Sequence, residues 1–224
     1  ENYLISVLEQ TQDHSVFSDE LKPWIKDWPS LYHLSSRRSN LLQPFKSWFN
    51  GKRVLEIGCG CGAITRFLAE AGATVISVEG SIRRARIASK RCADLENVTV
   101  ICCPSDQLPD LGEFDAVMLI GVLEYASMFL GTDGDTTLLQ NCRERLNNNG
   151  CLFVAIENKI GAKYLAGANE DHLAVPMVGV NDAYKDKSVR TYARQELINK
   201  LTGAGFPQTQ EFVRSEEHTS ELQS

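Results

Sequence analysis

The apolar residues of this chain change their spacing repeatedly between residues 54 and 213. Short continuous apolar runs predict buried parallel strands over 54–57, 73–78, 97–103, 114–120, 151–157 and 208–213. Apolar residues at helical spacing predict helices over 63–71, 81–93, 136–146 and 191–201. Strands that alternate with helices predict an α/β fold, with a doubly wound parallel sheet flanked by helices.

The segments outside this alternation are less regular. Residues 1–50 combine a helix start over 2–8, a break at Trp28-Pro29 and an amphipathic helix over 40–49, which together predict an N-terminal helical cap beside the sheet. Residues 147–150 are typical of a turn. The glycine-rich stretch 159–190 is irregular and long enough to carry a function of its own.

The end of the chain, residues 214–224, has neither periodicity nor an apolar face. Its sequence RSEEHTSELQS matches the translation of a widely used sequencing adapter, so we set it apart from the fold as an artefact; the alternative is a natural polar tail. We therefore expect three parts, which are a cap at 1–50, a domain at 51–213 and the adapter-like tail at 214–224. We also expect the native protein to continue beyond Val213.

The composition of the chain argues against a nucleic-acid-binding protein and against a membrane-spanning protein. The chain has 224 residues, 43% of them hydrophobic, and a net charge of −6, which argues against unaided binding to nucleic acid. No apolar run reaches the length of about 18 residues that a membrane span needs, and no signal peptide is evident. We expect no membrane span and a cytoplasmic location.

The cysteines indicate a reducing compartment rather than a disulfide framework. There are seven, an odd number. We expect five of them to be small buried side chains, namely Cys59, Cys61, Cys102, Cys103 and Cys151. Cys59-x-Cys61 is not zinc spacing and no matching pair lies elsewhere, so we expect no metal site.

The turn after the first predicted strand carries the strongest chemical signal. Gly58, Gly60 and Gly62 allow a tight turn and a close approach of a ligand to the backbone. Glu56 stands just before this turn, where its carboxylate would repel a pyrophosphate but suit a ligand that carries an ammonium and a sulfonium. Glu79, about 20 residues beyond the loop, is placed to accept hydrogen bonds from both ribose hydroxyls.

With these features the chain resembles the class I S-adenosylmethionine-dependent methyltransferases over roughly residues 51–213. The resemblance implies a Rossmann-like sheet, with S-adenosylmethionine across the carboxyl ends of its first strands. It also implies a truncated C-terminal edge, because the adapter-like tail stands where a seventh strand follows in the family. The residues that we expect to contact the cofactor are Glu56, Gly58, Cys59, Gly60, Gly62, Glu79, Gly80, Ser81, Ile82, Ser105, Asp106, Gln107, Ile120, Gly121 and Tyr125.

Several of these residues have particular roles in the resemblance. Asp106 would accept from the exocyclic amine of adenine, and Ile82 would lie against the ring or else belong to the core. The loop after Ile120 borders the methyl group in the family. Related enzymes often carry histidine where Tyr125 stands, so we expect Tyr125 to shape the pocket rather than act as a base.

The acceptor is indicated by a finer resemblance. The stretch IENKIGAKYLAGANEDHLAVP, together with Trp-Pro and YHLSSRRSNLL in the cap, resembles a bacterial subgroup whose methyltransferase domains occur beside glycosyltransferases in surface-polysaccharide assembly. The resemblance implies a hydroxyl acceptor on a sugar, a glycan or its lipid-linked precursor, and a glycosyltransferase as partner or fusion.

His172 is the candidate catalytic base. It follows Glu170 and Asp171, either of which would orient the imidazole while it takes a proton from a hydroxyl. The alternative is a surface capping cluster. His33 is a rival base, although such a residue more often packs. Tyr32 and Arg37 would close over the methionine carboxylate or simply start a solvated helix.

Three other functions stay open. One is a non-catalytic S-adenosylmethionine-binding module of a larger glycosyltransferase. Another is an NAD-dependent oxidoreductase, which Glu56 and the spacing of the glycines disfavour. A nucleic-acid methyltransferase would need a basic groove, and the run of arginines over 81–93 is more typical of a solvated helix face.

Overall fold

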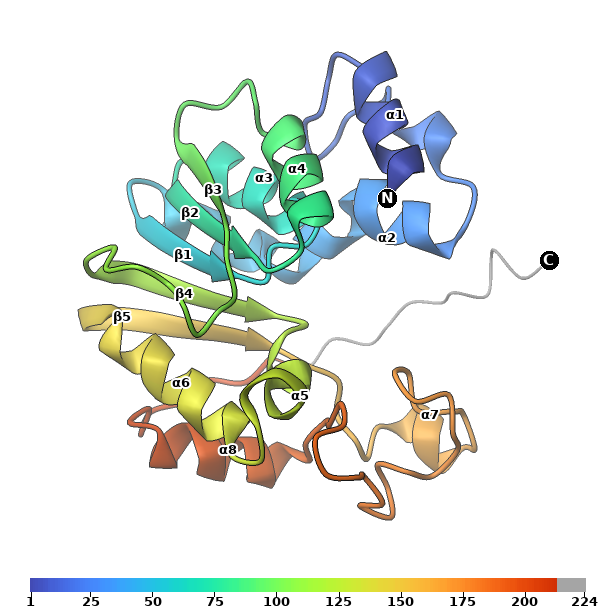
Figure 1. Ribbon diagram of the computed structural model, residues 1–224, viewed down its shortest axis with the longest axis vertical. Helices are drawn as coiled ribbons and strands as arrows, with labels where there is room; N and C mark the ends of the chain where they lie inside the picture. The colour runs from blue at the N-terminus through green and yellow to red at the C-terminus, as the bar shows by residue number, and fades with distance from the viewer. Residues whose placement is uncertain (213–224) are drawn as a thin grey trace. The chain divides into compact units, whose positions relative to one another are not determined.

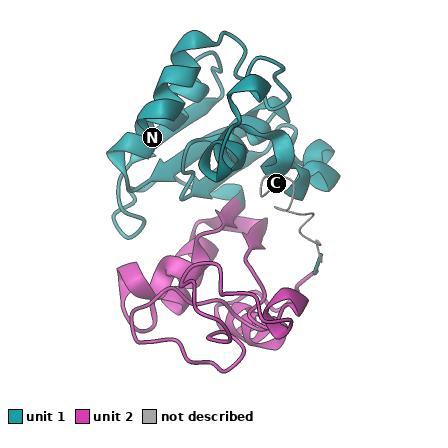
Figure 2. Ribbon diagram, turned by 90° about the vertical axis from the view of Figure 1, so that its right-hand side faces the viewer, with its two compact units in different colours: residues 1–116, 211–224 teal, residues 117–210 magenta. Residues whose placement is uncertain are grey.

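The computed structural model describes residues 1–212, so Val213 and the adapter-like tail predicted at 214–224 lie outside the described residues. The chain forms two compact units. Unit 1 consists of residues 1–116 and the segment that begins at Glu211, and unit 2 consists of residues 117–210 (Figure 2). The boundary between the units falls within a strand, and residues 1–50 belong to the same unit as the first strands. The division of the chain at residue 50 stays a prediction.

Unit 1 contains the predicted succession of strand, helix and strand. Strands β1 (Arg53–Ile57), β2 (Thr74–Glu79) and β3 (Val98–Cys102) are parallel, and Leu55 of β1 lies opposite Ile76 of β2. Helices α3 (Ala63–Glu70) and α4 (Ile82–Arg91) are the crossovers between them (Figure 1). Helix α4 buries an apolar stripe and exposes the opposite side, as the helical spacing predicted. Helix α3 is instead buried on nearly every side, and Glu70 is its one exposed residue.

Strands β4 (Phe114–Ile120) and β5 (Leu146–Ala155) complete a five-stranded sheet in the order β3-β2-β1-β4-β5. This order is that of a doubly wound sheet, in which the chain moves outward first to one side of β1 and then to the other. The predicted α/β, Rossmann-like fold is therefore confirmed.

The N-terminal segment of unit 1 is helical, as predicted. It contains α1 (Asn2–Gln10), α2 (Trp28–Leu34) and three 3₁₀ turns, η1 (Lys22–Trp24), η2 (Ser36–Leu41) and η3 (Gln43–Phe49). Its apolar residues form one cluster with the glycine loop and α4, which consists of Leu4, Val7, Leu8, Leu21, Leu34, Cys61 and Ile87. Burial of these side chains attaches the segment to α4.

Two predictions for this segment are wrong. The single helix predicted over 40–49 is two 3₁₀ turns, because Pro44 has no backbone N–H to continue a helix from η2 into η3. Trp28-Pro29 opens α2 instead of breaking a helix, since proline fits the first helical turn and the Asp27 carboxylate caps it by accepting from the Ser30 backbone N–H at 2.9 Å.

Unit 2 contains η4 (Leu123–Tyr125), α5 (Ala126–Leu130), α6 (Gly134–Glu144), α7 (Ala162–Leu165) and α8 (Arg194–Gly203). The segment between β5 and α8 has little regular structure, as predicted. Within residues 1–212, none of the helices is both long enough and apolar enough to cross a membrane.

Further corrections concern unit 2 and the outer strands. Residues 147–150 are not a turn but the start of β5, and α8 begins at Arg194 because the Glu196 carboxylate accepts from the Ala193 N–H at 2.8 Å. The described part of the predicted strand 208–213 has no strand structure. Cys102 and Cys151 are exposed rather than buried, because β3 and β5 are the outermost strands of the sheet order.

Gly62 is a position where only glycine fits. Its φ is +79°, and a Cβ atom there would lie 2.9 Å from Ala88 Cα of α4, whereas Gly60 has φ +56° with nothing within 4 Å. We expect Gly62→Ala to lower the free energy of unfolding by roughly 2–4 kcal/mol through strain and overpacking, and Gly60→Ala to lower it by about 1 kcal/mol through strain alone. Urea unfolding measures both values, and equal losses would contradict the close approach of α3 to α4.

Candidate functional site

The glycine loop that follows β1 is built from backbone strain that only glycine tolerates. Gly58, Gly60 and Gly62 have φ of +74°, +56° and +79°. The backbone N–H groups of Gly58 and Cys59 both donate to the Val78 carbonyl, at 2.8 and 3.0 Å, which ties the loop to β2. Gly62 is the N-cap of α3, so the loop leads directly into the positive end of that helix.

Glu56 brings a buried carboxylate to the base of this loop. Its side chain is 3% exposed, and Oε2 accepts hydrogen bonds from the Thr65 hydroxyl at 2.6 Å and the Ser77 hydroxyl at 2.8 Å. Burial raises the pKa of Glu56, and the two hydroxyl donors oppose that rise. A cationic ligand at the loop would stabilise the ionised form, which is what the sequence predicted for Glu56.

Glu79 joins the loop to α4. Its Oε2 accepts from the Gly60 N–H at 2.9 Å, and its Oε1 accepts from the Ser81 N–H at 2.9 Å and from Arg84 Nη2 at 2.7 Å. Glu79 therefore lies at the glycine loop, and its contact with a ribose stays a prediction. Both carboxylate oxygens already accept hydrogen bonds from the protein, so a ribose would have to share or displace these donors.

The other predicted cofactor residues of unit 1 lie at the ends of β2 and β3. Ile82, the first residue of α4, is 54% exposed, which rules out the alternative that it is a core residue. The Ser81 side chain makes no capping hydrogen bond, contrary to the expectation for an N-cap serine. Asp106 is exposed in a turn that the Gln107 N–H closes by donating to the Pro104 carbonyl at 3.1 Å.

Unit 2 contributes Ile120, Gly121 and Tyr125 from the end of β4 and the turn after it. The Gly121 N–H donates to the Ala155 carbonyl of β5 at 3.0 Å. The Tyr125 hydroxyl lies 3.1 Å from His172 Nδ1, with the two rings edge to face. His172 belongs to the irregular segment after α7, so the structure brings together residues 47 positions apart in the sequence.

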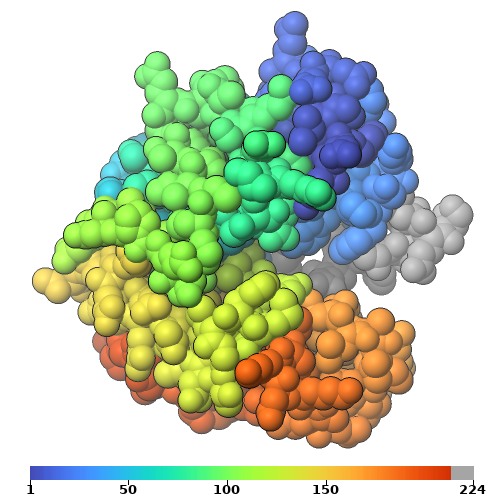
Figure 3. All heavy atoms as spheres, in the orientation of Figure 1, coloured from blue at the N-terminus to red at the C-terminus, as the bar shows by residue number. Residues whose placement is uncertain are grey.

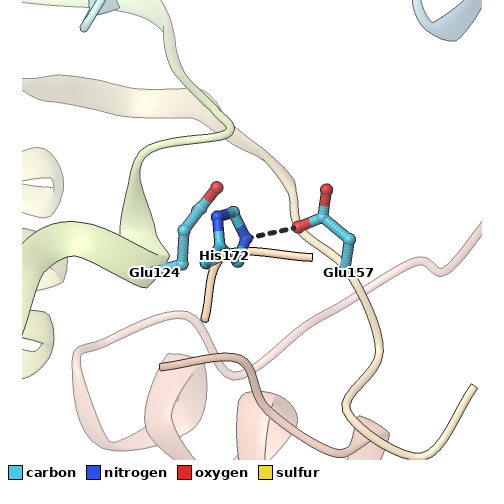
Figure 4. Close-up of side chains that lie close together, drawn as sticks. All are labelled: Glu124, Glu157 and His172. Carbon is cyan, nitrogen blue, oxygen red and sulfur yellow. Dashed lines mark ion pairs between the residues drawn. The ribbon is translucent and has the colours of Figure 1, made fainter. Parts of the chain in front are cut away.

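The His172 imidazole also faces a carboxylate that the sequence analysis gave no role. His172 Nε2 lies 3.5 Å from Glu157 Oε2, which makes an ion pair rather than a short hydrogen bond (Figure 4). The Glu157 carboxylate beside the imidazole raises the pKa of His172, and the same contact lowers the pKa of Glu157. The pair is therefore stabilised in its charged state.

The predicted orienting carboxylates lie elsewhere. Asp171 accepts from Lys163 Nζ and from the Tyr164 hydroxyl, both at 2.6 Å, and is not the carboxylate beside the imidazole. Glu170 Oε2 accepts from the backbone N–H groups of His172 and Leu173 at 2.8 and 2.6 Å. Glu170 therefore fixes the backbone that carries His172.

The segment that carries His172 packs against the turn after β4. The Arg190 N–H donates to the Glu124 carbonyl at 2.9 Å. In Figure 3 the atoms of this segment (orange) lie against those that follow β4 (yellow-green). One signal in the sequence could have identified Glu157, which is its position at the carboxyl end of a predicted parallel strand, where sites in such sheets form.

Glu124, Glu157 and His172 are also of the residue types that bind metals. Their ligand atoms all lie within 4.8 Å of one another, and Glu124 is 2% exposed. The sequence analysis predicted no metal site, and it missed this group because the three residues are far apart in the chain. By chemistry, the group can hold a proton on the imidazole or a divalent cation between its members.

The rival base His33 has the surroundings of a packed residue. Burial, followed by the nearby Arg91 guanidinium, lowers the pKa of His33 to about 4. Its Nε2 lies 3.9 Å from the Cys61 thiol, and its carbonyl accepts from Arg91. The neighbouring Tyr32 packs under the Arg38 guanidinium at 4.0 Å, and the Arg37 N–H donates to the Ser35 hydroxyl oxygen.

The sequence of the chain is similar to those of known methyltransferases. A family described as a methyltransferase domain matches residues 54–150. The ubiquinone biosynthesis O-methyltransferase of Haemophilus ducreyi is 28% identical over 153 residues, covering 60% of this chain and 61% of that protein. The protein of the same name from a Chelativorans strain is 32% identical, covering 52% of this chain and 48% of that protein.

Solved structures show the same fold. The magnesium protoporphyrin IX methyltransferase of Synechocystis, with S-adenosylhomocysteine bound, matches with a TM-score of 0.58 at 14% identity, covering 91% of this chain and 83% of that one. The CcbJ methyltransferase of Streptomyces caelestis matches with a TM-score of 0.55 at 21% identity, covering 71% and 81%.

Residues 54–150 therefore match a methyltransferase domain, and the chain has the fold of the class I S-adenosylmethionine-dependent methyltransferases. S-adenosylmethionine is the cofactor that these matches support. The chain spans 61% and 49% of the first two curated relatives, so the activity of the whole protein is a matter for proposal.

Replacement of the buried Glu56 should change the stability of the protein and its binding of ligand in opposite directions. Because its pKa in the folded protein is above the ordinary value of 4.5, folding takes up a proton, and stability rises as the pH falls from that raised pKa toward 4.5. At a pH where the parent carboxyl is ionised, we expect Glu56→Gln to raise the free energy of unfolding by roughly 1–3 kcal/mol, because it removes a buried charge. The same change should weaken binding of S-adenosylhomocysteine.

Urea unfolding at pH 7 and pH 5, with calorimetry at pH 7, measures these effects. The gain from Glu56→Gln should shrink as the pH falls, because protonation removes the cost of burying the parent carboxylate. A variant that loses stability at pH 7 and binds S-adenosylhomocysteine as the parent does would contradict both roles assigned to Glu56.

Proposed function

We propose that this chain transfers the methyl group of S-adenosylmethionine to a hydroxyl oxygen, and that the hydroxyl belongs to a sugar or a glycan precursor. The observation that carries this proposal is the His172 imidazole, held between the Tyr125 hydroxyl and the Glu157 carboxylate. Methyl transfer from a sulfonium to an alcohol releases a proton, and His172 is the group proposed to take it.

The chemistry of the centre supports a hydroxyl acceptor. An alcohol does not ionise near neutral pH, so its attack on a methyl group benefits from a base that removes the proton. Glu157 stabilises the imidazolium that forms when His172 has taken that proton. The curated relatives named O-methyltransferases add support for oxygen as the attacked atom.

The sugar as acceptor rests on the sequence resemblance alone. Quinone biosynthesis appears in the names of the relatives, which favours a phenolic hydroxyl as the second candidate. A phenol ionises near pH 10, far more readily than an alcohol, and depends less on a base. We further propose a glycosyltransferase as partner, which follows from the same resemblance, and a cytoplasmic location, which follows from the cysteines.

Cofactor binding is tested by calorimetric titration of the chain with S-adenosylhomocysteine, with NAD as the control ligand. We expect binding of S-adenosylhomocysteine alone. Glu79→Gln should weaken that binding by about 1–3 kcal/mol, because the ribose loses a charged acceptor, while Glu96→Gln, which removes an exposed carboxylate, should leave it unchanged. Binding of NAD alone would favour the oxidoreductase instead.

Transfer is tested with radiolabelled S-adenosylmethionine and two sets of probe acceptors, methyl glycosides and simple catechols. We expect label in the glycosides, and at least a hundredfold loss with His172→Gln, the lower end of what a general base contributes. Label in the catechols alone would identify the phenol as acceptor. Binding of S-adenosylmethionine with no transfer to either, and no effect of His172→Gln on partner function, would favour the non-catalytic module.

A further inference from the structure

The two nitrogens of the His172 imidazole lie next to different side chains. The imidazole has a different partner on each nitrogen, with the Tyr125 hydroxyl 3.1 Å from Nδ1 and Glu157 Oε2 3.5 Å from Nε2. An ionised carboxylate only accepts hydrogen bonds, so it favours the neutral tautomer that carries its proton on Nε2. Nδ1 then has a lone pair, and the Tyr125 hydroxyl is the donor to it.

We propose that Tyr125, His172 and Glu157 form a proton relay, in which the Tyr125 hydroxyl receives the acceptor's proton while passing its own to His172 Nδ1, and Glu157 positions the imidazole. This inference rests on the proposed function. It gives Tyr125 a role in the chemistry, whereas the sequence analysis expected it to shape the pocket only.

The step balances without any further reactant. The acceptor oxygen forms a bond to the methyl carbon as the bond between that carbon and sulfur breaks, which leaves neutral S-adenosylhomocysteine. The acceptor proton moves to Tyr125 Oη, and the Tyr125 proton moves to His172 Nδ1. The resulting imidazolium has a proton on each nitrogen, and the proton on Nε2 faces Glu157. The proton on Nδ1 is then released to solvent, which restores the neutral imidazole.

The position of Tyr125 supports its place at the head of the relay. Tyr125 ends η4, the short turn that follows the carboxyl end of β4, and open parallel sheets bind their ligands beyond the carboxyl ends of the strands. His172 has a side chain only 14% exposed. The Tyr125 hydroxyl therefore extends the reach of a base that is itself largely buried.

The remaining charges around the imidazole are acidic. Glu124 lies on the same turn as Tyr125, and Glu170 lies on the segment of His172 itself; after Glu157, both raise the pKa of His172. Asp171 is engaged with Lys163 and Tyr164. Asp171 therefore serves as a matched control, because its removal takes one negative charge from the same segment without breaking the relay.

The test combines the titration of His172 with methyl transfer. NMR of the four histidines follows the pKa and the tautomer of His172, with His172→Gln for assignment. We expect the neutral form to carry its proton on Nε2. Glu157→Gln should lower the pKa of His172 and Asp171→Asn should change it much less.

The rate of transfer to the methyl glycoside probe gives the second readout. We expect the parent to lose activity as the pH falls through the pKa of His172, and Glu157→Gln to move that loss to lower pH while lowering the maximal rate. A purely structural role of Glu157 would lower the rate without moving the profile. Tyr125→Phe should lower kcat by roughly 10²–10⁴-fold, with a far smaller change in affinity for S-adenosylhomocysteine.

Three results would overturn the relay. One is a pKa of His172 that Glu157→Gln leaves unchanged, another is full activity in Tyr125→Phe, and the third is a His172 signal that responds to one equivalent of Zn²⁺ as a metal ligand would. Failure of the proposed function looks different. In that case the parent transfers no methyl group to either probe, although His172 still titrates with Glu157 as expected.

Discussion

The glycine loop between β1 and α3 is the constraint on which the rest of unit 1 depends. Positive φ at Gly58, Gly60 and Gly62 lets the chain reverse within a few residues, and the missing side chain at Gly62 lets α3 approach α4. Two buried carboxylates flank this loop. Glu56 is held by hydroxyls of α3 and β2, and Glu79 is held by the backbone of the loop and by Arg84.

These carboxylates explain why the loop suits a cationic ligand better than a phosphate. Each costs free energy to bury, and the protein compensates with hydrogen bonds rather than with a fully buried cation. An ammonium at Glu56 would offset part of that cost on binding. The second centre, in unit 2, follows the same logic, because a histidine and the carboxylates around it stabilise a proton there.

Most of the fold of unit 1 could be predicted because period and turn chemistry agree there. The apolar run of β1, the glycines and the helical spacing of α3 all indicate one arrangement. The prediction was wrong where the local preference of a residue disagreed with the structure that its neighbours form. Pro44 divides what looked like a helix, and the asparagines at 147–149 belong to β5 although asparagine favours turns.

The residues of the candidate site also differ in how well the sequence predicts them. Glu56 and Glu79 could be found because they lie next to the loop in sequence or one strand away. The position of Glu157 at the end of a predicted strand marks it as a candidate, but its partnership with His172 could not be predicted, because it depends on how an irregular segment folds back over the turn after β4. Asp171 was the natural candidate by adjacency in sequence, yet its carboxylate turns to Lys163 and Tyr164.

A crystal structure of the chain with S-adenosylhomocysteine is the measurement that decides whether the glycine loop is the cofactor site. We expect the ribose hydroxyls at Glu79 and the methionine amine on the side of Glu56. A cofactor bound away from the glycine loop would contradict this assignment.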